Sequence, residues 1–212
     1  MSVVIEDGAV VLFQGDSITD AGWSRVDDGD LGQGYAMMAA AMFSAICPDR
    51  RVRLINRGVS GDRVRDLRAR WREDCLNLRP TWVSIMIGVN DTWRAFDSND
   101  PTSTEAFEAD YRHILEQVRD HLGARLILIE PFVLPEPPDR LEWRADLDPR
   151  IDVVRRLAQA FGAALVPMDG IFARACEVRE PSFWAPDGVH PTPAGHAVIA
   201  KAWLEAVGIR VS

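Results

Sequence analysis

The sequence predicts an α/β fold, a three-layer α/β/α sandwich built on a five-stranded parallel sheet. Short apolar runs rich in β-branched and aliphatic residues recur along the chain, as expected of strands that are covered on both faces. Helical patterns lie between these runs, so the strands are joined by right-handed crossovers and run parallel. The length of 212 residues fits one domain, and we expect residues 1–212 to form it.

Each strand is predicted from one apolar run of ordinary strand length. The first run leads directly into a Gly-Asp-Ser sequence, and the last run is the shortest. In chain order the runs are Ala9–Gln14, Val52–Asn56, Trp82–Ile87, Arg125–Glu130 and Ala163–Val166.

Helices are predicted where apolar residues recur at spacings of three and four. A last helix is expected from Pro193 to about Val207, with Thr192 as its N-cap. Two long loops remain, Ala21–Gly34 and Pro131–Pro149. Long loops in compact α/β folds usually rim a site, and a plain surface loop is the alternative. The three apolar stripes are Val64, Leu67, Trp71, Cys75 and Leu78; Phe107, Tyr111, Ile114 and Val118; and Ile151, Val154, Ala158 and Phe161.

The composition excludes several classes of protein. A net charge of −8 disfavours nucleic acid as the main partner. The three cysteines are far apart in the sequence, so neither a disulfide framework nor a zinc cluster is expected. No apolar run is long enough to span a membrane, and Met1–Phe13 lacks the basic region of a signal peptide. We therefore expect a soluble cytoplasmic protein.

Arginine makes up nearly all of the positive charge, since Lys201 is the only lysine among 24 basic residues. One group of arginines crowds a single predicted helix among acidic residues, which is typical of a solvated or interface helix with ion pairs. Another group flanks polar segments and is expected to brace loops through bidentate bonds to Asp62 or Asp91. The first group is Arg63, Arg65, Arg68, Arg70 and Arg72, and the second is Arg57, Arg63 and Arg94.

Small and polar residues follow the predicted strands. The carboxyl ends of parallel strands meet at one edge of a sheet, where ligands bind, so these segments should lie together. Taken singly, each has a plainer interpretation as a turn, and Ser17 is open to interpretation as a helix N-cap. The four segments are Gly15–Ile18, Asn56–Asp62, Gly88–Asp91 and, further along, Asp187–Pro191.

These segments contain the groups that acyl transfer requires. Ser17 is a candidate nucleophile, His190 a general base on a rigid mount, and Asp187 the carboxylate that orients it. The N–H groups of Ser17 and Gly61 and the side chain of Asn90 are candidate donors to an oxyanion. The other histidines fall on predicted helices and are not expected to act; they are His113, His121 and His196.

The four segments together resemble the SGNH hydrolases, also called the GDSL-like esterase/lipase family, with Ile18 in place of the more usual leucine. This resemblance implies a flavodoxin-like fold, a catalytic triad of Ser17, Asp187 and His190, and an oxyanion hole completed by Gly61 and Asn90. It also implies that no metal or organic cofactor is needed.

A closer resemblance is to intracellular acetyl esterases that deacetylate xylo-oligosaccharides. It implies a small acylated substrate, acetyl as the acyl group, and possible self-association, to which an exposed Trp203 and Val207 on the last helix would contribute. Trp93, Arg94 and Trp184 are expected on the rim, the two tryptophans as sugar platforms or as core residues. The stretches that carry the resemblance are Gly15–Asp20, Ser60–Leu67, Ile87–Arg94 and His190–His196.

Two other functions stay open. A lysophospholipase or acyl-thioesterase of the same family would need an apolar groove, whereas the rim segments are rich in Asp, Arg, Pro and Trp. A non-catalytic binding module on a decayed hydrolase fold is disfavoured, because every candidate catalytic position holds a chemically competent residue.

Overall fold

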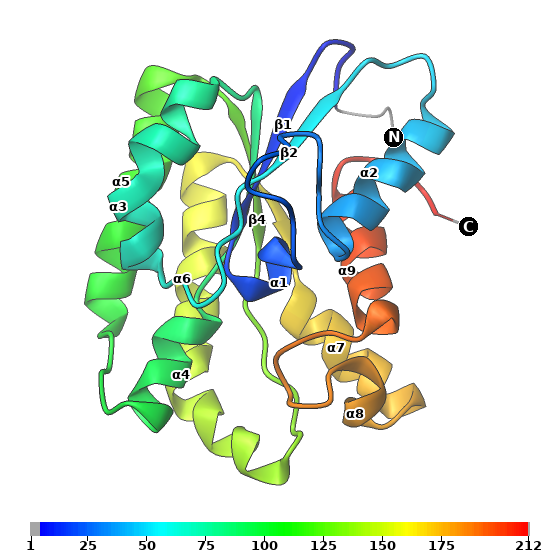
Figure 1. Cartoon of the computed structure of the whole chain (residues 1–212). Helices are drawn as coiled ribbons and strands as arrows, with labels where there is room; N and C mark the ends of the chain where they lie inside the picture. Colours follow the sequence, from blue (N-terminus) through cyan, green and yellow to red (C-terminus); the bar gives the residue numbers. More distant parts are fainter. Residues whose placement is uncertain (1–4, 212) are drawn as a thin grey trace.

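The computed structural model describes residues 5–211 and has three layers, with a parallel sheet between two layers of helices (Figure 1). The five strands lie in the order β2-β1-β3-β4-β5. The strand β1 therefore lies inside the sheet, with β2 on one side of it and β3, β4 and β5 following in turn on the other side. The predicted fold class and all five strands are confirmed. The strands are β1 (Val10–Gly15), β2 (Arg53–Asn56), β3 (Trp82–Met86), β4 (Arg125–Ile129) and β5 (Ala164–Val166).

Alternate residues of the central strands point into two separate cores. On β1, Val11 and Phe13 face one core and Leu12 faces the other, and β3 and β4 alternate in the same way. Helices α3 (Val64–Asp74), α5 (Thr104–His121) and α6 (Arg144–Phe161) cover one face of the sheet. Helices α2 (Tyr35–Ile46), α7 (Met168–Val178) and α9 (Pro193–Ala206) cover the other face.

Several helices were not predicted. The α2 segment is apolar on nearly all sides, so it carries no helical stripe that a periodicity argument can find. Three more helices begin shortly after strands: α1 (Ser17–Asp20) after β1, α4 (Val89–Asp97) after β3, and α7 after β5. The 3₁₀ helix η2 (Pro138–Trp143) lies within a predicted loop, the 3₁₀ helix η1 (Leu76–Leu78) follows α3, and α8 (Pro181–Trp184) follows α7.

The prediction of a loop over Pro131–Pro149 is wrong in its second half. A 3₁₀ helix occupies Pro138–Trp143, and α6 already begins at Arg144 and includes Pro149. The helix persists through the proline because the side chains of Leu147 and Ile151 on either side of it are buried in the core. The loop Ala21–Gly34 contains neither helix nor strand, as predicted.

The prediction that Trp203 and Val207 are exposed is wrong. Their exposed fractions are 0% and 1%, so neither residue is available to a partner chain. The Trp203 ring packs on Phe13 with 5.3 Å between ring centroids, and its indole N–H donates to Ser84 Oγ at 3.0 Å. The indole therefore fastens α9 to the middle of the sheet.

Two expectations from the composition have structural counterparts. The cysteines are free thiols, with Cys47 and Cys75 buried and Cys176 partly buried. None of the helices within residues 5–211 has the length and apolar character that crossing a bilayer requires. The prediction about a leader over Met1–Phe13 involves residues 1–4, which lie outside the described residues.

Candidate active site

Ser17, His190 and Asp187 form a continuous hydrogen-bonded chain at the carboxyl ends of the strands. Ser17 Oγ lies 2.9 Å from His190 Nε2, and His190 Nδ1 lies 2.6 Å from Asp187 Oδ2. A carboxylate only accepts, so Nδ1 carries the proton of the neutral ring and Nε2 accepts from the serine hydroxyl. The arrangement has the connectivity of a nucleophile, a base and an orienting acid.

His190 is held by a tight turn that begins at Asp187. Asp187 Oδ1 accepts the backbone N–H groups of Val189 at 3.0 Å and His190 at 2.7 Å. Thr192 caps α9 by accepting the N–H of Gly195, as predicted. His190 thus lies between the turn at Asp187 and the capped start of α9. Both hold the backbone in place and so fix the direction in which its side chain points.

Electrostatics keep Asp187 ionised and favour the protonated ring of His190. Burial alone would raise the pKa of Asp187, but hydrogen bonds from the His190 ring and from the turn outweigh it and hold that pKa below its usual range. The hydrogen bond that His190 Nδ1 donates to Asp187 raises the pKa of His190, against an opposing contribution from partial burial. This pairing strengthens the histidine as a proton acceptor.

Ser17 is positioned by the residue before it. Asp16 is the N-cap of α1, and its Oδ1 accepts the N–H of Ile18 at 3.0 Å. The alternative interpretation of Ser17 as the N-cap is therefore wrong. Ser17 stands in the first turn of the helix, where its own N–H has no partner within the helix and stays free for a ligand. Burial raises the pKa of Asp16 to about 7.

Gly61 and Asn90 lie on the two segments that flank this serine. Gly61 has a φ of +87°, in the left-handed region that favours glycine, and a Cβ there would meet no atom within 4 Å. Asn90 Nδ2 donates one hydrogen to the carbonyl of Asp62 at 3.0 Å, which fixes the direction of the amide. The second hydrogen of this group is left for another acceptor.

The rim residues predicted from the sequence have different surroundings. The Trp93 ring lies beside the imidazole of His190, with 5.7 Å between the ring centroids. Arg94 pairs with Asp97 on its own helix. The indole N–H of Trp184 donates to the carbonyls of Ala175 and Arg179, so it ties α8 to the end of α7.

Other residues beside His190 were missed by the sequence analysis. Trp143 packs against Trp93 at 5.3 Å, and the Arg140 guanidinium lies 4.1 Å from the centroid of the Trp143 ring. Arg140 Nε also donates to the carbonyl of Asp187 at 3.3 Å. The only signal for these residues was their place in the predicted long loop, which did not distinguish them from their neighbours.

The predicted arginine braces exist but use other carboxylates. Asp62 and Asp91, the expected partners, instead accept from Arg70 and from the backbone N–H of Val64. For Arg57 and Arg63 the sequence could not reveal this, because their partners lie in other segments, whereas Arg94 pairs within its own helix. The observed pairs are Arg57 with Asp28, Arg63 with Asp100, and Arg94 with Asp97.

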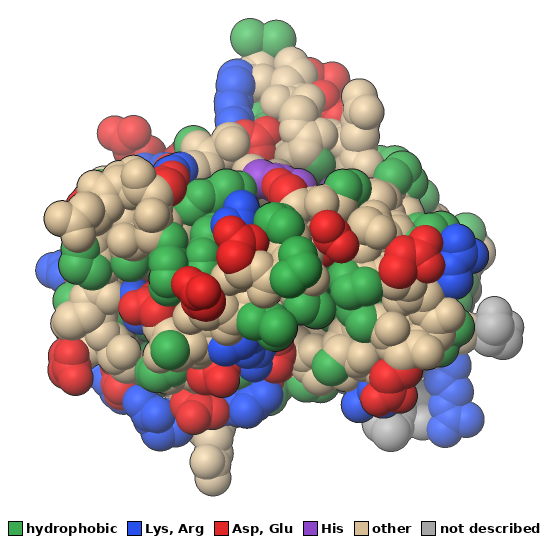
Figure 2. All heavy atoms as spheres, turned by 90° about the horizontal axis from the view of Figure 1, so that it is seen from below, with side chains coloured by type: hydrophobic (Ala, Val, Ile, Leu, Met, Phe, Trp, Pro, Cys, Tyr) green, Lys and Arg blue, Asp and Glu red, His purple; other side chains and the backbone are tan. Residues whose placement is uncertain are grey.

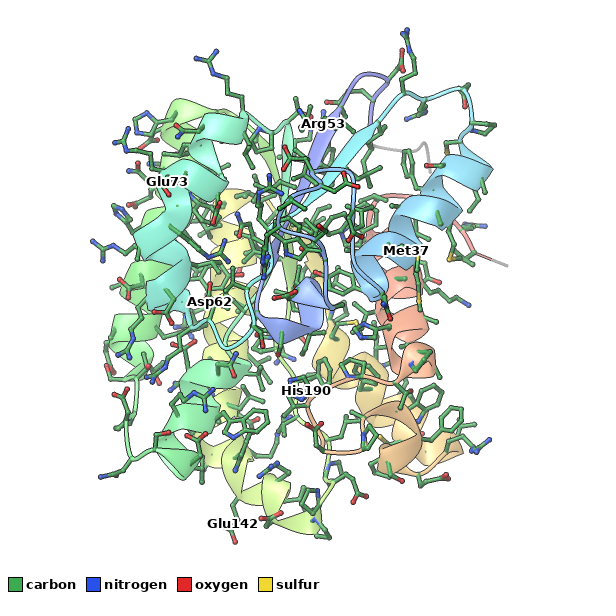
Figure 3. The ribbon with its side chains drawn as sticks, viewed as in Figure 1. Met37, Arg53, Asp62, Glu73, Glu142 and His190 are labelled. Atoms are coloured by element: carbon green, nitrogen blue, oxygen red, sulfur yellow. The ribbon has the colours of Figure 1, made fainter. Side chains whose placement is uncertain are left out.

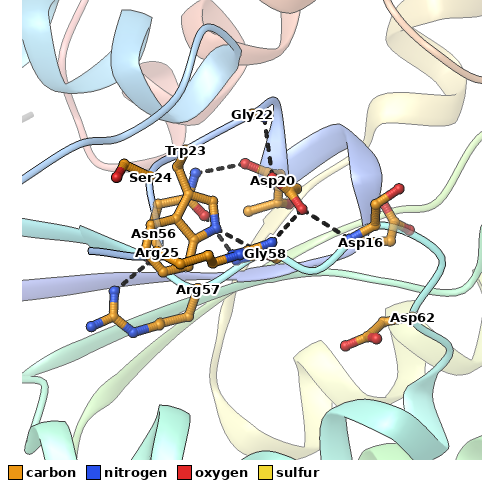
Figure 4. Close-up of polar contacts among 12 residues, drawn as sticks. Asp16, Asp20, Gly22, Trp23, Ser24, Arg25, Asn56, Arg57, Gly58 and Asp62 are labelled. Atoms are coloured by element: carbon orange, nitrogen blue, oxygen red, sulfur yellow. Dashed lines mark hydrogen bonds and ion pairs between the residues drawn. The ribbon is translucent and has the colours of Figure 1, made fainter. Parts of the chain in front are cut away.

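The loop Ala21–Gly34 is fastened beside the second polar segment (Figure 4). The carbonyl of Gly58 accepts from the Trp23 indole and the Arg25 guanidinium, each at 2.8 Å. Asp20 Oδ2 accepts from Arg25 at 2.6 Å and from the N–H of Ser60 at 3.0 Å. These bonds connect the end of α1 to the segment that carries Gly61.

The four polar segments therefore lie on one side of the molecule. His190 and Asp62 are found on this side, whereas Arg53, at the start of β2, lies at the opposite end of the sheet (Figure 3). Seen from below, this face carries a histidine next to acidic side chains, with hydrophobic side chains gathered beside it (Figure 2).

Residues 13–198 match the GDSL-like Lipase/Acylhydrolase family, and the chain belongs to that family. It is therefore a carboxylic ester hydrolase, as the sequence predicts. It is 35% identical to the acetylxylan esterase of Geobacillus stearothermophilus, and the match covers 96% of each chain.

Solved structures agree with this relationship. The crystal structure of Axe2, an acetylxylan esterase from Geobacillus stearothermophilus, has a TM-score of 0.91 at 34% identity, over 98% of this chain and 97% of that one. LAE5, an alpha/beta hydrolase enzyme from the metagenome of Lake Arreo, Spain, has a TM-score of 0.92 at 36% identity over 100% of both chains.

Proposed function

We propose that the protein is a serine esterase that removes acetyl groups from acetylated xylo-oligosaccharides or similar sugars. The observation that carries the proposal is the bonded chain from Ser17 Oγ through His190 to Asp187. The order of hydroxyl, imidazole and carboxylate along this chain supports the roles of nucleophile, base and orienting acid in acyl transfer.

The reaction proceeds through an acyl-enzyme. Ser17 Oγ attacks the ester carbonyl while His190 Nε2 takes its proton, and Asp187 stabilises the imidazolium. The oxyanion accepts from the N–H groups of Ser17 and Gly61 and from the Asn90 amide. The sugar hydroxyl leaves with the proton from His190. His190 then takes a proton from water as the water attacks the acyl-serine, and it returns that proton to Ser17 Oγ as acetate leaves.

The relatives and the rim support an acetylated sugar as substrate. The acetylxylan esterase relative matches nearly the whole length of the chain. The Trp93 ring lies 5.7 Å from the His190 ring, measured between centroids. At this place its aromatic face would pack on a pyranose next to the ester. The indole N–H of Trp184 is occupied by carbonyls of the α7 end, so Trp93 is the better-supported platform and Trp184 the lesser one.

Substrate competition tests this function. Acetylated xylo-oligosaccharides, p-nitrophenyl acetate and p-nitrophenyl octanoate would be compared by kcat/KM, with Ser17→Ala as the blank. The proposal expects acetyl esters to be preferred and the octanoyl ester to be poor. Preference for octanoyl would favour a lysophospholipase or thioesterase, and no turnover with any ester would favour a binding module.

Trp93→Ala tests the sugar platform separately. We expect KM for acetylated xylo-oligosaccharides to rise while KM for p-nitrophenyl acetate, which has no sugar ring, changes little. An unchanged KM for the oligosaccharides would overturn the platform but leave the esterase assignment intact.

A further inference from the structure

The three proposed oxyanion donors come from three segments that are far apart in the sequence. The N–H of Ser17 follows β1, that of Gly61 lies in the loop after β2, and the Asn90 amide is on α4. A backbone hydrogen bond joins the segment after β1 to the loop after β2. The N–H of Val59 donates to the carbonyl of Gly15 at 3.0 Å. Gly61 lies beyond that bond, at a position with left-handed backbone, so other contacts must fix its direction.

Arg70 makes such a contact from helix α3. Its Nε donates to Asp62 Oδ2 at 2.7 Å, directly beside Gly61, and its Nη2 lies 3.4 Å from the carbonyl of Gly15. Its Nη1 donates to Gln14 Oε1 at 2.9 Å. One guanidinium thus joins the loop that carries Gly61 to the end of the strand that carries Ser17.

Asp62 extends this connection to the third donor. Its carboxylate is held by Arg70, and its carbonyl accepts from Asn90 Nδ2 at 3.0 Å. Movement of Asp62 would therefore turn the amide of Asn90 as well as the N–H of Gly61.

Burial and neighbouring bonds make this arrangement rigid. The Arg70 side chain is 16% exposed and that of Asp62 is 13% exposed, so water screens the pair only partly. Asp74 accepts from Arg70 at 3.1 Å and, through its carbonyl, from Gln14 at 2.7 Å. Arg70 is therefore not a residue of a solvated face, as the charge pattern of its helix predicts, but an internal connector.

We propose that Arg70 is a positioning residue that sets the geometry of the oxyanion hole by locking Asp62 to the end of β1. This inference rests on the proposed function, because it requires Gly61 and Asn90 to receive the oxyanion. The planar guanidinium reaches three groups in fixed directions, which the single ammonium of lysine cannot do. Donor geometry acts on the transition state more than on the bound substrate, so kcat should carry the effect.

The test compares Arg70→Lys and Asp62→Asn with Arg68→Lys, at a temperature well below all unfolding transitions. Arg68 is on the same helix but pairs with Asp110 at the surface, so it controls for loss of an ion pair on α3. We expect kcat on p-nitrophenyl acetate to fall roughly 10- to 100-fold in the first two variants, with little change in KM. The rate of phosphonylation by a fluorophosphonate should fall in parallel, and Arg68→Lys should match the wild type.

A second arm uses the double variant. Arg70→Lys and Asp62→Asn break the same bond, so the double variant should lose about as much kcat as either single variant. The proposal is overturned if kcat of both single variants equals that of Arg68→Lys, or if their losses are multiplied in the double variant. If the fluorophosphonate labels a residue other than Ser17 in the wild type, the proposed function itself is overturned. This result is distinct from the kinetic results that would overturn only the role of Arg70.

Discussion

At the scale of single residues, the pKa of His190 decides when the proposed base is active. The ring accepts a proton only when neutral, so activity falls as the pH drops below its pKa. The hydrogen bond that the ring donates to Asp187 raises that pKa. Replacing the carboxylate by an amide removes this contribution, and the pKa of the ring then falls.

Asp187→Asn should therefore move the acidic limb of the kcat/KM profile to lower pH. Its plateau should also fall by roughly 10⁴-fold, because an amide does not hold the productive tautomer. Asp120→Asn breaks only the exposed pair with Arg119 and should leave the limb in place. If the acidic limb of the Asp187→Asn profile is unchanged or moves to higher pH, the assignment of His190 as the base is contradicted.

Asp16 links the nucleophile turn to stability. Burial raises its pKa from 3.8 to about 7, so between these values the folded state holds a proton that the unfolded state has lost. The stability that this proton contributes is present at low pH and is lost as the pH rises through the folded-state value. Asp16→Asn keeps an N-cap acceptor but no longer titrates.

We expect the wild type to lose more stability than Asp16→Asn between about pH 5 and about pH 8. Urea unfolding midpoints of both proteins at both pH values measure the difference. Equal pH dependence of the two midpoints would show that this carboxyl does not titrate in that window.

At the scale of elements, the turn that carries His190 depends on the segment after β4. The N–H of Leu134 donates to the carbonyl of Gly188 at 2.8 Å. Gly188 has a φ of +80°, and a Cβ there would lie 2.4 Å from the carbonyl oxygen of Glu136 and 2.7 Å from that of Leu134. The close approach of two backbones excludes any side chain.

Gly188→Ala should lower both stability and kcat, because the turn must move away from the segment after β4. Gly123 has a φ of +61° with no atom within 4 Å of a Cβ, so Gly123→Ala measures the backbone strain alone. We expect about 1 kcal/mol of destabilisation for Gly123→Ala with unchanged kcat, and roughly 2 kcal/mol more for Gly188→Ala. Chemical denaturation and steady-state kinetics would measure both effects, and equal results for the two variants would contradict the role of the contact.

The helices on the α3 side are joined by Arg150, whose side chain is 1% exposed. Its Nη2 donates to the carbonyl of Thr102 at 2.5 Å and lies 3.0 Å from Asp146 Oδ1. The guanidinium also faces Asp91, whose carboxyl has its pKa raised to about 6 by burial. This cation therefore compensates the buried carboxyl group of Asp91 and the partly exposed one of Asp146.

Arg150→Met should destabilise the fold by roughly 3–5 kcal/mol, because it leaves the buried Asp91 carboxyl without a cation. Arg156→Met removes an exposed arginine of the same helix that pairs with Glu108, and should cost about 0–1 kcal/mol. Urea denaturation measures the two changes. A loss in Arg150→Met no larger than that in Arg156→Met would show that the buried cation contributes little.

At the scale of the whole molecule, the strands and the segments that meet at the candidate site were predictable, because they are marked in the local sequence. Dense apolar runs mark the five strands, and polar residues directly after them mark the edge where Ser17 and His190 meet. Residues whose roles depend on distant partners were not predictable. Arg70 and Arg150 have the charge of surface residues, but the fold places carboxylates around them. Trp203 is buried because β1 and β3 receive it, which its own helix does not reveal.

The arginine excess is explained on the same scale. Most of the arginine pairs have at least one exposed partner, and pairs that are exposed on both sides contribute little each. A small number are internal, and arginine suits them because its planar group bonds several acceptors at once.

Ser17 is the residue that we expect to carry the acyl group. The most direct measurement is to treat the enzyme with a fluorophosphonate and locate the adduct by peptide mass spectrometry, with p-nitrophenyl acetate turnover followed in parallel. We predict one adduct, on Ser17, together with loss of turnover, and neither labelling nor turnover in a folded Ser17→Ala variant. An adduct on another residue, or ester turnover retained by Ser17→Ala, would contradict the account.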